Sequence, residues 1–152
     1  MKTEKDFEDL LRLFNKNKVK YCIVGGYAMA FYARPRFTKD IDILVEPTQE
    51  NALRILKSLN LFGFKSLDLK DKDFTKEGAI IQLGYEPFRI DLITGIEGCS
   101  FKEVWRNRAT GAYGKQKVNF IGLKELIKNK RASNRKQDQT DIALLKSKPT
   151  KK

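Results

Sequence analysis

The chain has 152 residues, the size of one domain, and its 41% hydrophobic and 11% aromatic residues are enough to fill a core. It has no histidine, which excludes imidazole catalysis and most zinc sites, and only two cysteines, too few for a disulfide framework. Of its net charge of +12, residues 115–152 carry +9 (twelve Lys or Arg against three acids), and such a segment either binds a polyanion (a nucleotide, RNA, DNA or anionic lipid) or is a solubilising surface.

The first predicted elements are a helix, a buried strand and a second helix. The charged N-terminus is not a signal peptide, and Thr3 can cap a helix with the apolar face Phe7, Leu10, Leu11 and Phe14. Residues 20–24 form a short apolar strand that ends at two glycines, and residues 27–33 favour a helix. The apolar run 21–33 is too short to cross a bilayer. Together with the charged N-terminus and the presence of only two cysteines, this predicts a reduced, cytoplasmic protein.

Pro35 ends the second helix, and the basic loop "RPRFTK" leads into a strand over residues 40–46. Pro47 and Thr48 begin the next helix, which is expected to end near Gly63. Its predicted apolar stripe consists of Ala52, Leu53, Leu56 and Leu59.

The second half of the chain adds strands and then helices. Residues 65–78 are highly charged and predict a loop or a poorly packed hairpin. The later elements are strands over 79–84 and 88–94 joined by a turn, a helix over 100–108 capped by Ser100, a strand over 117–122, and helices over 123–133 and 137–147. This order predicts an α/β (α+β) fold, a sheet covered by helices.

The expected organisation is one domain over residues 1–146. Its C-terminal helical part covers about 122–146, and residues 147–152 are expected to be a disordered basic tail.

Acidic residues on two predicted strands form the first candidate site. Asp40 and Asp42 are two residues apart in their strand and therefore share a face. In the strand over 88–94, Arg89 and Asp91 share a face for the same reason. Carboxylates 4 Å apart repel by about 4 kcal/mol at an effective dielectric near 20. Divalent cations offset this repulsion, because Mg²⁺ prefers oxygen ligands and two such ions can clamp a phosphoryl transfer. The alternative is that Arg34, Arg36 or Lys39 pairs with Asp40.

Two glycines, Gly25 and Gly26, stand between the first strand and the helix that follows it. Glycine at this position lets backbone N–H groups approach a phosphate at a helix N-terminus, although an ordinary tight turn has the same sequence. A phosphate cradle, a basic loop and the two aspartates within about twenty residues together fit a metal-bound triphosphate.

The segments "VGGYAMAFYARPRFTKDIDILVE", "FRIDLI" and "LKELIKNKRASNRKQDQTDIALL" resemble the nucleotidyltransferase superfamily with the DNA polymerase β-like fold. More narrowly, they are similar to small bacterial abortive-infection or toxin-type members. The resemblance implies a small mixed sheet flanked by helices, with a C-terminal helical pair. It also implies that Asp40, Asp42 and Asp91 are catalytic and hold two Mg²⁺ ions (or Mn²⁺), and that Gly25 and Gly26 contact the β- and γ-phosphates.

Further residues are candidates for nucleotide binding. Arg36, Thr38 and Lys39 come from the basic loop. Lys124 and Lys128 share one face of a predicted helix, and the alternative is that this face is simply exposed to solvent. Two acids of the C-terminal helix, Asp138 and Asp141, share a face with Leu145 and are expected to pair with nearby Lys or Arg rather than with a metal. Trp105 and Tyr113 could stack on a base, but a core role is expected for Trp105.

The resemblance implies transfer of a nucleoside monophosphate from an NTP to a hydroxyl, with release of pyrophosphate. The expected acceptor is RNA, such as a tRNA 3′ end, in a toxin–antitoxin-like role with a cognate partner protein. Two alternatives stay open: an acceptor hydroxyl on a partner protein or a small antibiotic, and a non-catalytic nucleotide- or RNA-binding module.

Overall fold

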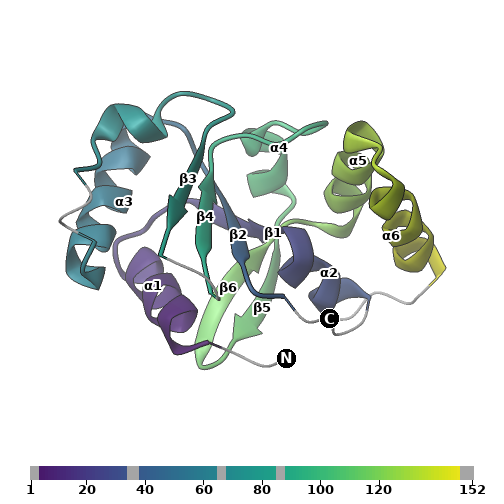
Figure 1. Ribbon diagram of the computed structural model, residues 1–152, viewed down its shortest axis with the longest axis horizontal. Coiled ribbons are helices and arrows are strands. Elements are labelled where there is room, and N and C mark those ends of the chain that lie inside the picture. The colour runs from purple at the N-terminus through teal and green to yellow at the C-terminus, as the bar shows by residue number, and fades with distance from the viewer. Residues whose placement is uncertain (1–3, 34–37, 65–67, 85–87, 148–152) are drawn as a thin grey trace.

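The computed structural model describes residues 4–33, 38–64, 68–84 and 88–147. A six-stranded mixed sheet in the order β3-β4-β2-β1-β6-β5 forms its centre (Figure 1). The strands are β1 (Tyr21–Val24), β2 (Ile41–Val45), β3 (Ile80–Leu83), β4 (Ile90–Ile93), β5 (Ala109–Tyr113) and β6 (Gln116–Phe120).

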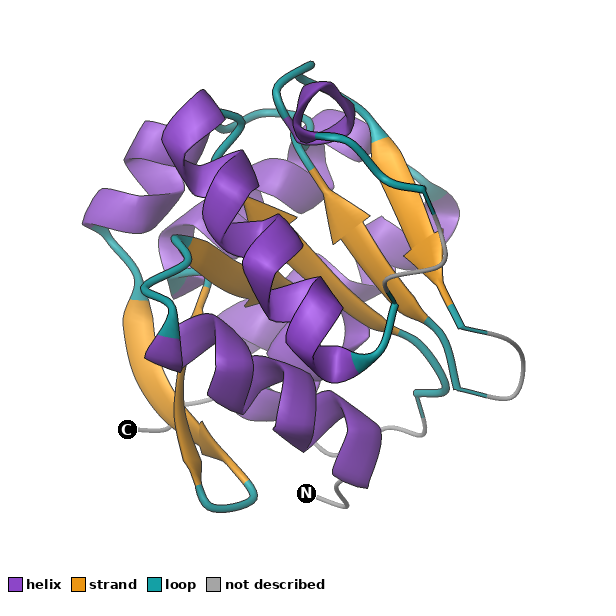
Figure 2. Cartoon of the chain, turned by 90° about the vertical axis from the view of Figure 1, so that its left-hand side faces the viewer, coloured by secondary structure: helices purple, strands orange, loops and turns teal. Residues whose placement is uncertain are grey.

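Helices lie at both ends of the sheet and over it. They are α1 (Lys5–Lys16), α2 (Gly25–Tyr32), α3 (Gln49–Phe62), α4 (Phe101–Arg106), α5 (Leu123–Ser133) and α6 (Lys136–Ser147), with a 3₁₀ helix, η2 (Asp71–Phe74). Figure 1 shows α5 and α6 as a pair at one end, and Figure 2 shows α1 and α3 in front of the strands from the other end. The predicted mixed sheet with flanking helices and a C-terminal helical pair is confirmed.

The strand register determines where the acids lie. Strand β2 pairs antiparallel with β1 on one side and parallel with β4 on the other. In this register Asp42 is the partner of Val24 in β1 and of Asp91 in β4. Three segments that are distant in sequence therefore meet at one position of the sheet.

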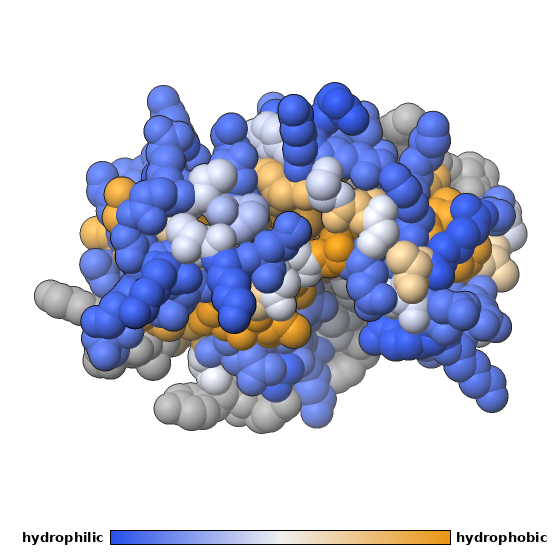
Figure 3. Space-filling view, turned by 90° about the horizontal axis from the view of Figure 1, so that it is seen from above, coloured by the Kyte–Doolittle hydropathy of each residue, from blue (hydrophilic) through white to orange (hydrophobic). Residues whose placement is uncertain are grey.

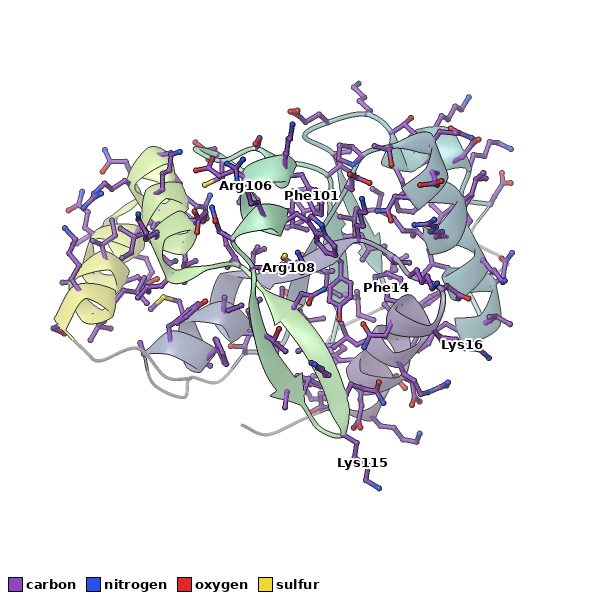
Figure 4. All side chains as sticks on the ribbon, turned by 180° about the vertical axis from the view of Figure 1, so that it is seen from behind. Phe14, Lys16, Phe101, Arg106, Arg108 and Lys115 are labelled. Carbon is purple, nitrogen blue, oxygen red and sulfur yellow. The ribbon has the colours of Figure 1, made fainter. Side chains whose placement is uncertain are left out.

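Helix α1 buries the apolar face that the spacing predicts: Phe7, Leu10, Leu11 and Phe14 are all at most 1% exposed. The ring of Phe14 packs at 5.8 Å from that of Tyr21 in β1, and Figure 4 shows it pointing toward the strands. The helix begins after Glu4, and the predicted cap, Thr3, lies outside the described residues.

Helix α3 begins and ends as predicted. The Thr48 side chain accepts a hydrogen bond from the Asn51 backbone N–H, and Gly63 ends the helix with φ +113°. The predicted apolar stripe was wrong at Leu53, which is 53% exposed, whereas Ile55 is fully buried. At 3.6 residues per turn, Leu53 lies about 100° around the helix axis from Ala52 and faces solvent.

Strand β5 had no counterpart in the sequence prediction. It forms a hairpin with β6 through a turn at Gly114, whose φ is +61°, and Lys115 extends from the tip of this hairpin (Figure 4). Its residues other than Tyr113 are small, and a Cβ on Gly111 would lie 2.7 Å from the Phe120 ring. Packing against that ring, not β propensity, explains the strand.

The charged segment after α3 is more ordered than a plain loop. It contains η2, whose Phe74 is fully buried against the core next to α3. Residues 65–67, and the tail after Ser147, lie outside the described residues, so the one-domain boundary and the disordered tail remain predictions.

Seen from above, the surface is mainly hydrophilic, with apolar side chains visible between charged ones near its middle (Figure 3). In the part of the chain that the structure describes, every helix is too short or too polar to cross a bilayer.

Candidate active site

Asp42 and Asp91 lie side by side on neighbouring strands. Their Cα atoms are register partners in the parallel β2–β4 pair, so both side chains leave the same face of the sheet. Asp91 is 8% exposed, and Asp42 is partly buried. The predicted arrangement, with the third acid on a strand adjacent to the first two, is therefore present.

Asp40 directly precedes β2, and Arg89 connects it to Asp91. Arg89 Nη2 lies 3.0 Å from Asp40 Oδ2, and Arg89 Nε lies 3.0 Å from Asp91 Oδ1. Within the described residues, the cation that pairs with Asp40 is thus Arg89. Of the residues considered for this role, Lys39 is exposed, and Arg34 and Arg36 lie outside the described residues.

This crowding of carboxylates alters the protonation of Asp42. Burial, followed by the negative charges of Asp91 and Asp40 and a hydrogen bond with Asp91, raises the pKa of Asp42 to about 6, while Arg89 acts in the opposite direction. Within the described residues, Asp40 Oδ1 is buried without a hydrogen-bond partner. A buried carboxylate oxygen without a partner and two neighbouring acids that repel each other both favour a bound cation.

The glycine turn is packed directly against these acids. Gly25 has φ +68°, and a Cβ there would overlap Asp42 Oδ2 and lie 3.1 Å from Asp42 Cγ. A Cβ on Gly26 would lie 2.9 Å from Thr38 Oγ1. Both glycines are therefore required by close approach, and the N-terminus of α2 begins beside the acids.

A cleft of about 590 Å³ opens at this position. Gly25 and Asp42 line it together with Asn129 and Ser133 of α5 and Arg135, which precedes α6. These last three residues were missed in the sequence prediction. The i, i+4 spacing of Asn129 and Ser133 places them on one helix face, but nothing in the sequence relates that face to the glycine turn.

The predicted lysines lie elsewhere. Lys124 and Lys128 line a second pocket of about 540 Å³, and Lys128 Nζ pairs with Glu103 Oε2 at 2.8 Å. The structure does not bring these lysines together with the acids, and their part in nucleotide binding remains a prediction. Thr38 lies over the first turn of α2, and Arg36 is outside the described residues.

The two C-terminal acids are structural, as predicted. Asp138 and Asp141 are at most 1% exposed, and Lys130 Nζ lies 3.5 Å from Asp138 Oδ1 and 2.9 Å from Asp141 Oδ2. Arg135 Nε lies 2.9 Å from Asp138 Oδ2, and this hydrogen bond is the main reason why the pKa of Asp138 is lowered. The network joins α5 to α6 and fixes Arg135 beside the cleft.

The two aromatic candidates pack within the protein. Tyr113 is fully buried, and its hydroxyl accepts a hydrogen bond from the Glu4 backbone N–H at 2.8 Å. Trp105 stacks on Phe101, and the Arg108 guanidinium lies over the Trp105 ring at 3.7 Å from its centroid. Phe101 and Arg108 are labelled in Figure 4.

The acids fit a divalent cation by donor type. Asp40, Asp42 and Asp91 supply oxygen ligands of the kind that Mg²⁺ prefers, and one of these oxygens, Asp40 Oδ1, is buried without a hydrogen-bond partner in the part of the chain that the structure describes. Among the described residues, however, no three His, Cys, Asp or Glu side chains are already grouped as a metal site. Two of the three acids, Asp40 and Asp91, pair with Arg89 instead.

Solved structures of other proteins share this fold. The lincosamide antibiotic adenylyltransferase LnuA, in its lincomycin-bound structure, is 17% identical with a TM-score of 0.58, over 95% of this chain and 97% of that one. TM1012 from Thermotoga maritima, described as a candidate nucleotidyltransferase, is 13% identical with a TM-score of 0.54, over 93% of this chain and 88% of that one. No curated protein matches the sequence significantly.

The chain belongs to the family described as "Nucleotidyltransferase of unknown function (DUF6036)", which matches residues 4–146. The predicted superfamily and enzyme class are thereby confirmed.

Proposed function

We propose that this protein is a divalent-metal-dependent enzyme that transfers a nucleoside monophosphate from an NTP to a hydroxyl acceptor. The observation that carries the proposal is the register of β2 and β4, which sets Asp42 beside Asp91 with Gly25 packed against Asp42. A fold has little use for such a carboxylate pair unless a cation offsets its repulsion.

Each residue has a role in the proposed reaction. Asp40, Asp42 and Asp91 would hold Mg²⁺, two ions in the full site with Mn²⁺ as a substitute, and the metal would stabilise the charge on the phosphate oxygens. The N–H groups at Gly25 and Gly26 would bind the β- and γ-phosphates at the N-terminus of α2. The acceptor hydroxyl oxygen bonds to the α-phosphorus, its proton passes to Asp91, and the bond to pyrophosphate breaks.

The proposed acceptor is RNA, such as a tRNA 3′ end, in a toxin–antitoxin role with a cognate partner in the cytoplasm. The +9 charge of residues 115–152 supports it, because a polyanion gains most from such a segment.

A small-molecule acceptor is the second candidate. The cleft that contains Asp42 is also lined by Glu77, Glu97 and Ile96, and acidic and apolar groups suit a cationic organic molecule better than a phosphate chain. LnuA, which has the same fold, is a lincosamide antibiotic adenylyltransferase.

The test is label transfer from each of the four α-³²P-labelled NTPs, with Mg²⁺ or Mn²⁺. The acceptors are total tRNA, a panel of hydroxylated cationic antibiotics and a lysate of the host. We expect label in tRNA with the wild type and with Asp68→Asn, a control at an exposed acid outside the site, and none with Asp42→Asn or Asp91→Asn. Label in an antibiotic or a protein would move the proposal to that acceptor, and no label in any arm would refute it.

A further inference from the structure

Arg89 bridges two of the three acids of the candidate site. Its guanidinium reaches both Asp40 and Asp91: Nη2 lies 3.0 Å from Asp40 Oδ2 and 3.4 Å from Asp91 Oδ2, and Nε lies 3.0 Å from Asp91 Oδ1. Planar guanidinium pairs of this kind hold carboxylates at a defined distance and orientation.

The ion pairs are too sheltered to be ordinary surface contacts. The side chains of Arg89, Asp40 and Asp91 are 27%, 28% and 11% exposed, so water screens them less than it screens surface pairs. Arg89 also precedes β4 by one residue, and the β2–β4 register places its backbone beside the start of β2, since Ile41 N–H donates to Arg89 O at 3.0 Å. Backbone and side chain together therefore fix Arg89 at the acids.

Within the described residues, the single positive charge of Arg89 acts on three carboxyl groups, since it pairs with Asp40 and Asp91 and also lowers the pKa of Asp42. Asp40 Oδ1 is buried without a hydrogen-bond partner among these residues. Of the residues that the structure describes, Arg89 is thus a partial counter-charge for the three acids. A cation that binds Asp40 and Asp91 must repel Arg89 or draw both acids away from it.

We propose that Arg89 is a positioning residue that holds Asp40 and Asp91 ready in the metal-free protein and competes with the divalent cation for them. The inference rests on the proposed function only in taking these acids as the metal ligands. It predicts that Arg89 sets a weak metal affinity in the absence of nucleotide. Metal binding would then strengthen when the phosphates of an NTP give the guanidinium another anionic partner.

The experiment measures Mn²⁺ binding to the full chain without nucleotide, from the decrease of the free-Mn²⁺ electron paramagnetic resonance signal. The variants are Arg89→Met, Arg89→Gln and Arg89→Lys, with Arg54→Met as the matched control. Arg54 also pairs with a carboxylate, Glu50 at 3.6 Å, but on the surface of α3. Asp42→Asn reports whether the bound Mn²⁺ is at the acids.

We expect Arg89→Met and Arg89→Gln to bind Mn²⁺ at least about tenfold more tightly than the wild type. The Mn²⁺ affinity of Arg89→Lys should be intermediate and that of Arg54→Met unchanged. Asp42→Asn should bind Mn²⁺ much more weakly than the wild type. Circular dichroism and a melting curve identify any variant that fails to fold, and having two neutral variants guards against losing one. Binding that is unchanged or weaker in the folded neutral variants, or undetectable in all proteins, would overturn the proposal.

The result is separable from the transferase test. Tighter Mn²⁺ binding without any label transfer keeps the role of Arg89 and refutes the transferase. Label transfer with unchanged Mn²⁺ binding supports the transferase and refutes the proposed role of Arg89, which would then be a purely structural residue.

Discussion

At the scale of single residues, Asp42 is held in a protein environment that disfavours its charge. Burial and the neighbouring acids raise its pKa to about 6 from an ordinary value of 3.8. Between these two values the folded state holds a proton that the unfolded state has lost, so the stability of the metal-free protein falls as pH rises and is constant above about pH 6.

Asp42→Asn should therefore stabilise the metal-free protein by about 1–3 kcal/mol at pH 7.5 while abolishing activity. Near pH 4 the difference from the wild type should be much smaller, because Asp42 is then protonated when folded and partly protonated when unfolded. Urea unfolding in EDTA at both pH values measures this, with Asp68→Asn as the control. A variant less stable than the wild type at pH 7.5 would contradict the assignment.

Gly25 combines two constraints that can be separated by experiment. Alanine there would be strained at φ +68° and would also displace the Asp42 carboxylate, whereas Gly63 has φ +113° with nothing within 4 Å of a Cβ. We expect Gly25→Ala and Gly63→Ala each to lose about 1–3 kcal/mol of stability from backbone strain. Only Gly25→Ala should lose Mn²⁺ binding and label transfer, and equal loss in both would count against contact between Gly25 and the site.

At the scale of elements, the α5–α6 pair depends on a buried charge network. Asp138 is 0% exposed and pairs with Lys130 and Arg135, which lower its pKa. Its contribution to stability is present above the ordinary pKa of an aspartate and is lost as pH falls below it.

Asp138→Ala should therefore destabilise the protein by about 3 kcal/mol at pH 7, because it leaves Lys130 less well paired in the interior. The midpoint of urea unfolding at pH 7 measures the loss, and Asp68→Ala is the exposed counterpart. A change within about 0.5 kcal/mol would mean that α5 and α6 are held together by their apolar contacts instead.

Most elements were predictable because local signals agreed with burial. The Thr48 cap, the αL position of Gly63 and the Ser100 cap of α4 each satisfy a backbone requirement that sequence makes visible. Strand β5 was not predicted because Ala109, Gly111 and Ala112 have little β propensity. Leu53 was misplaced because a leucine next to the apolar stripe cannot be distinguished from a core residue without knowing what the helix packs against.

The candidate site was predictable where its residues share a local pattern. Alternation along a strand and glycines before a helix point to Asp40, Asp42 and Gly25 from sequence alone. The pairing of β2 with β4, the reach of Arg89 to two acids and the entry of Arg135 into the cleft depend on strand order and helix packing. No local pattern encodes those long-range contacts.

At the scale of the whole molecule, the +12 net charge distinguishes the two acceptor classes. Binding to an RNA through about three phosphate contacts should weaken by about 20- to 40-fold between 50 and 200 mM KCl, because counterions are released on binding. Transfer to tRNA at subsaturating concentration should show this loss, while Mn²⁺ binding without nucleotide, compared as a control, should change much less. A rate independent of salt would favour a small, uncharged or weakly charged acceptor.

Helix α6 contacts α2, and Arg135 just before it is tied to Asp138 at the edge of the cleft. A nonsense or frameshift mutation near residue 134 would spare every aspartate and glycine of the site. The shortened product would nevertheless lose Arg135 from the cleft and the contact of α6 with the helix that follows the glycine turn. A search for the motif would still find such a gene, so the motif by itself is insufficient evidence that a relative is active.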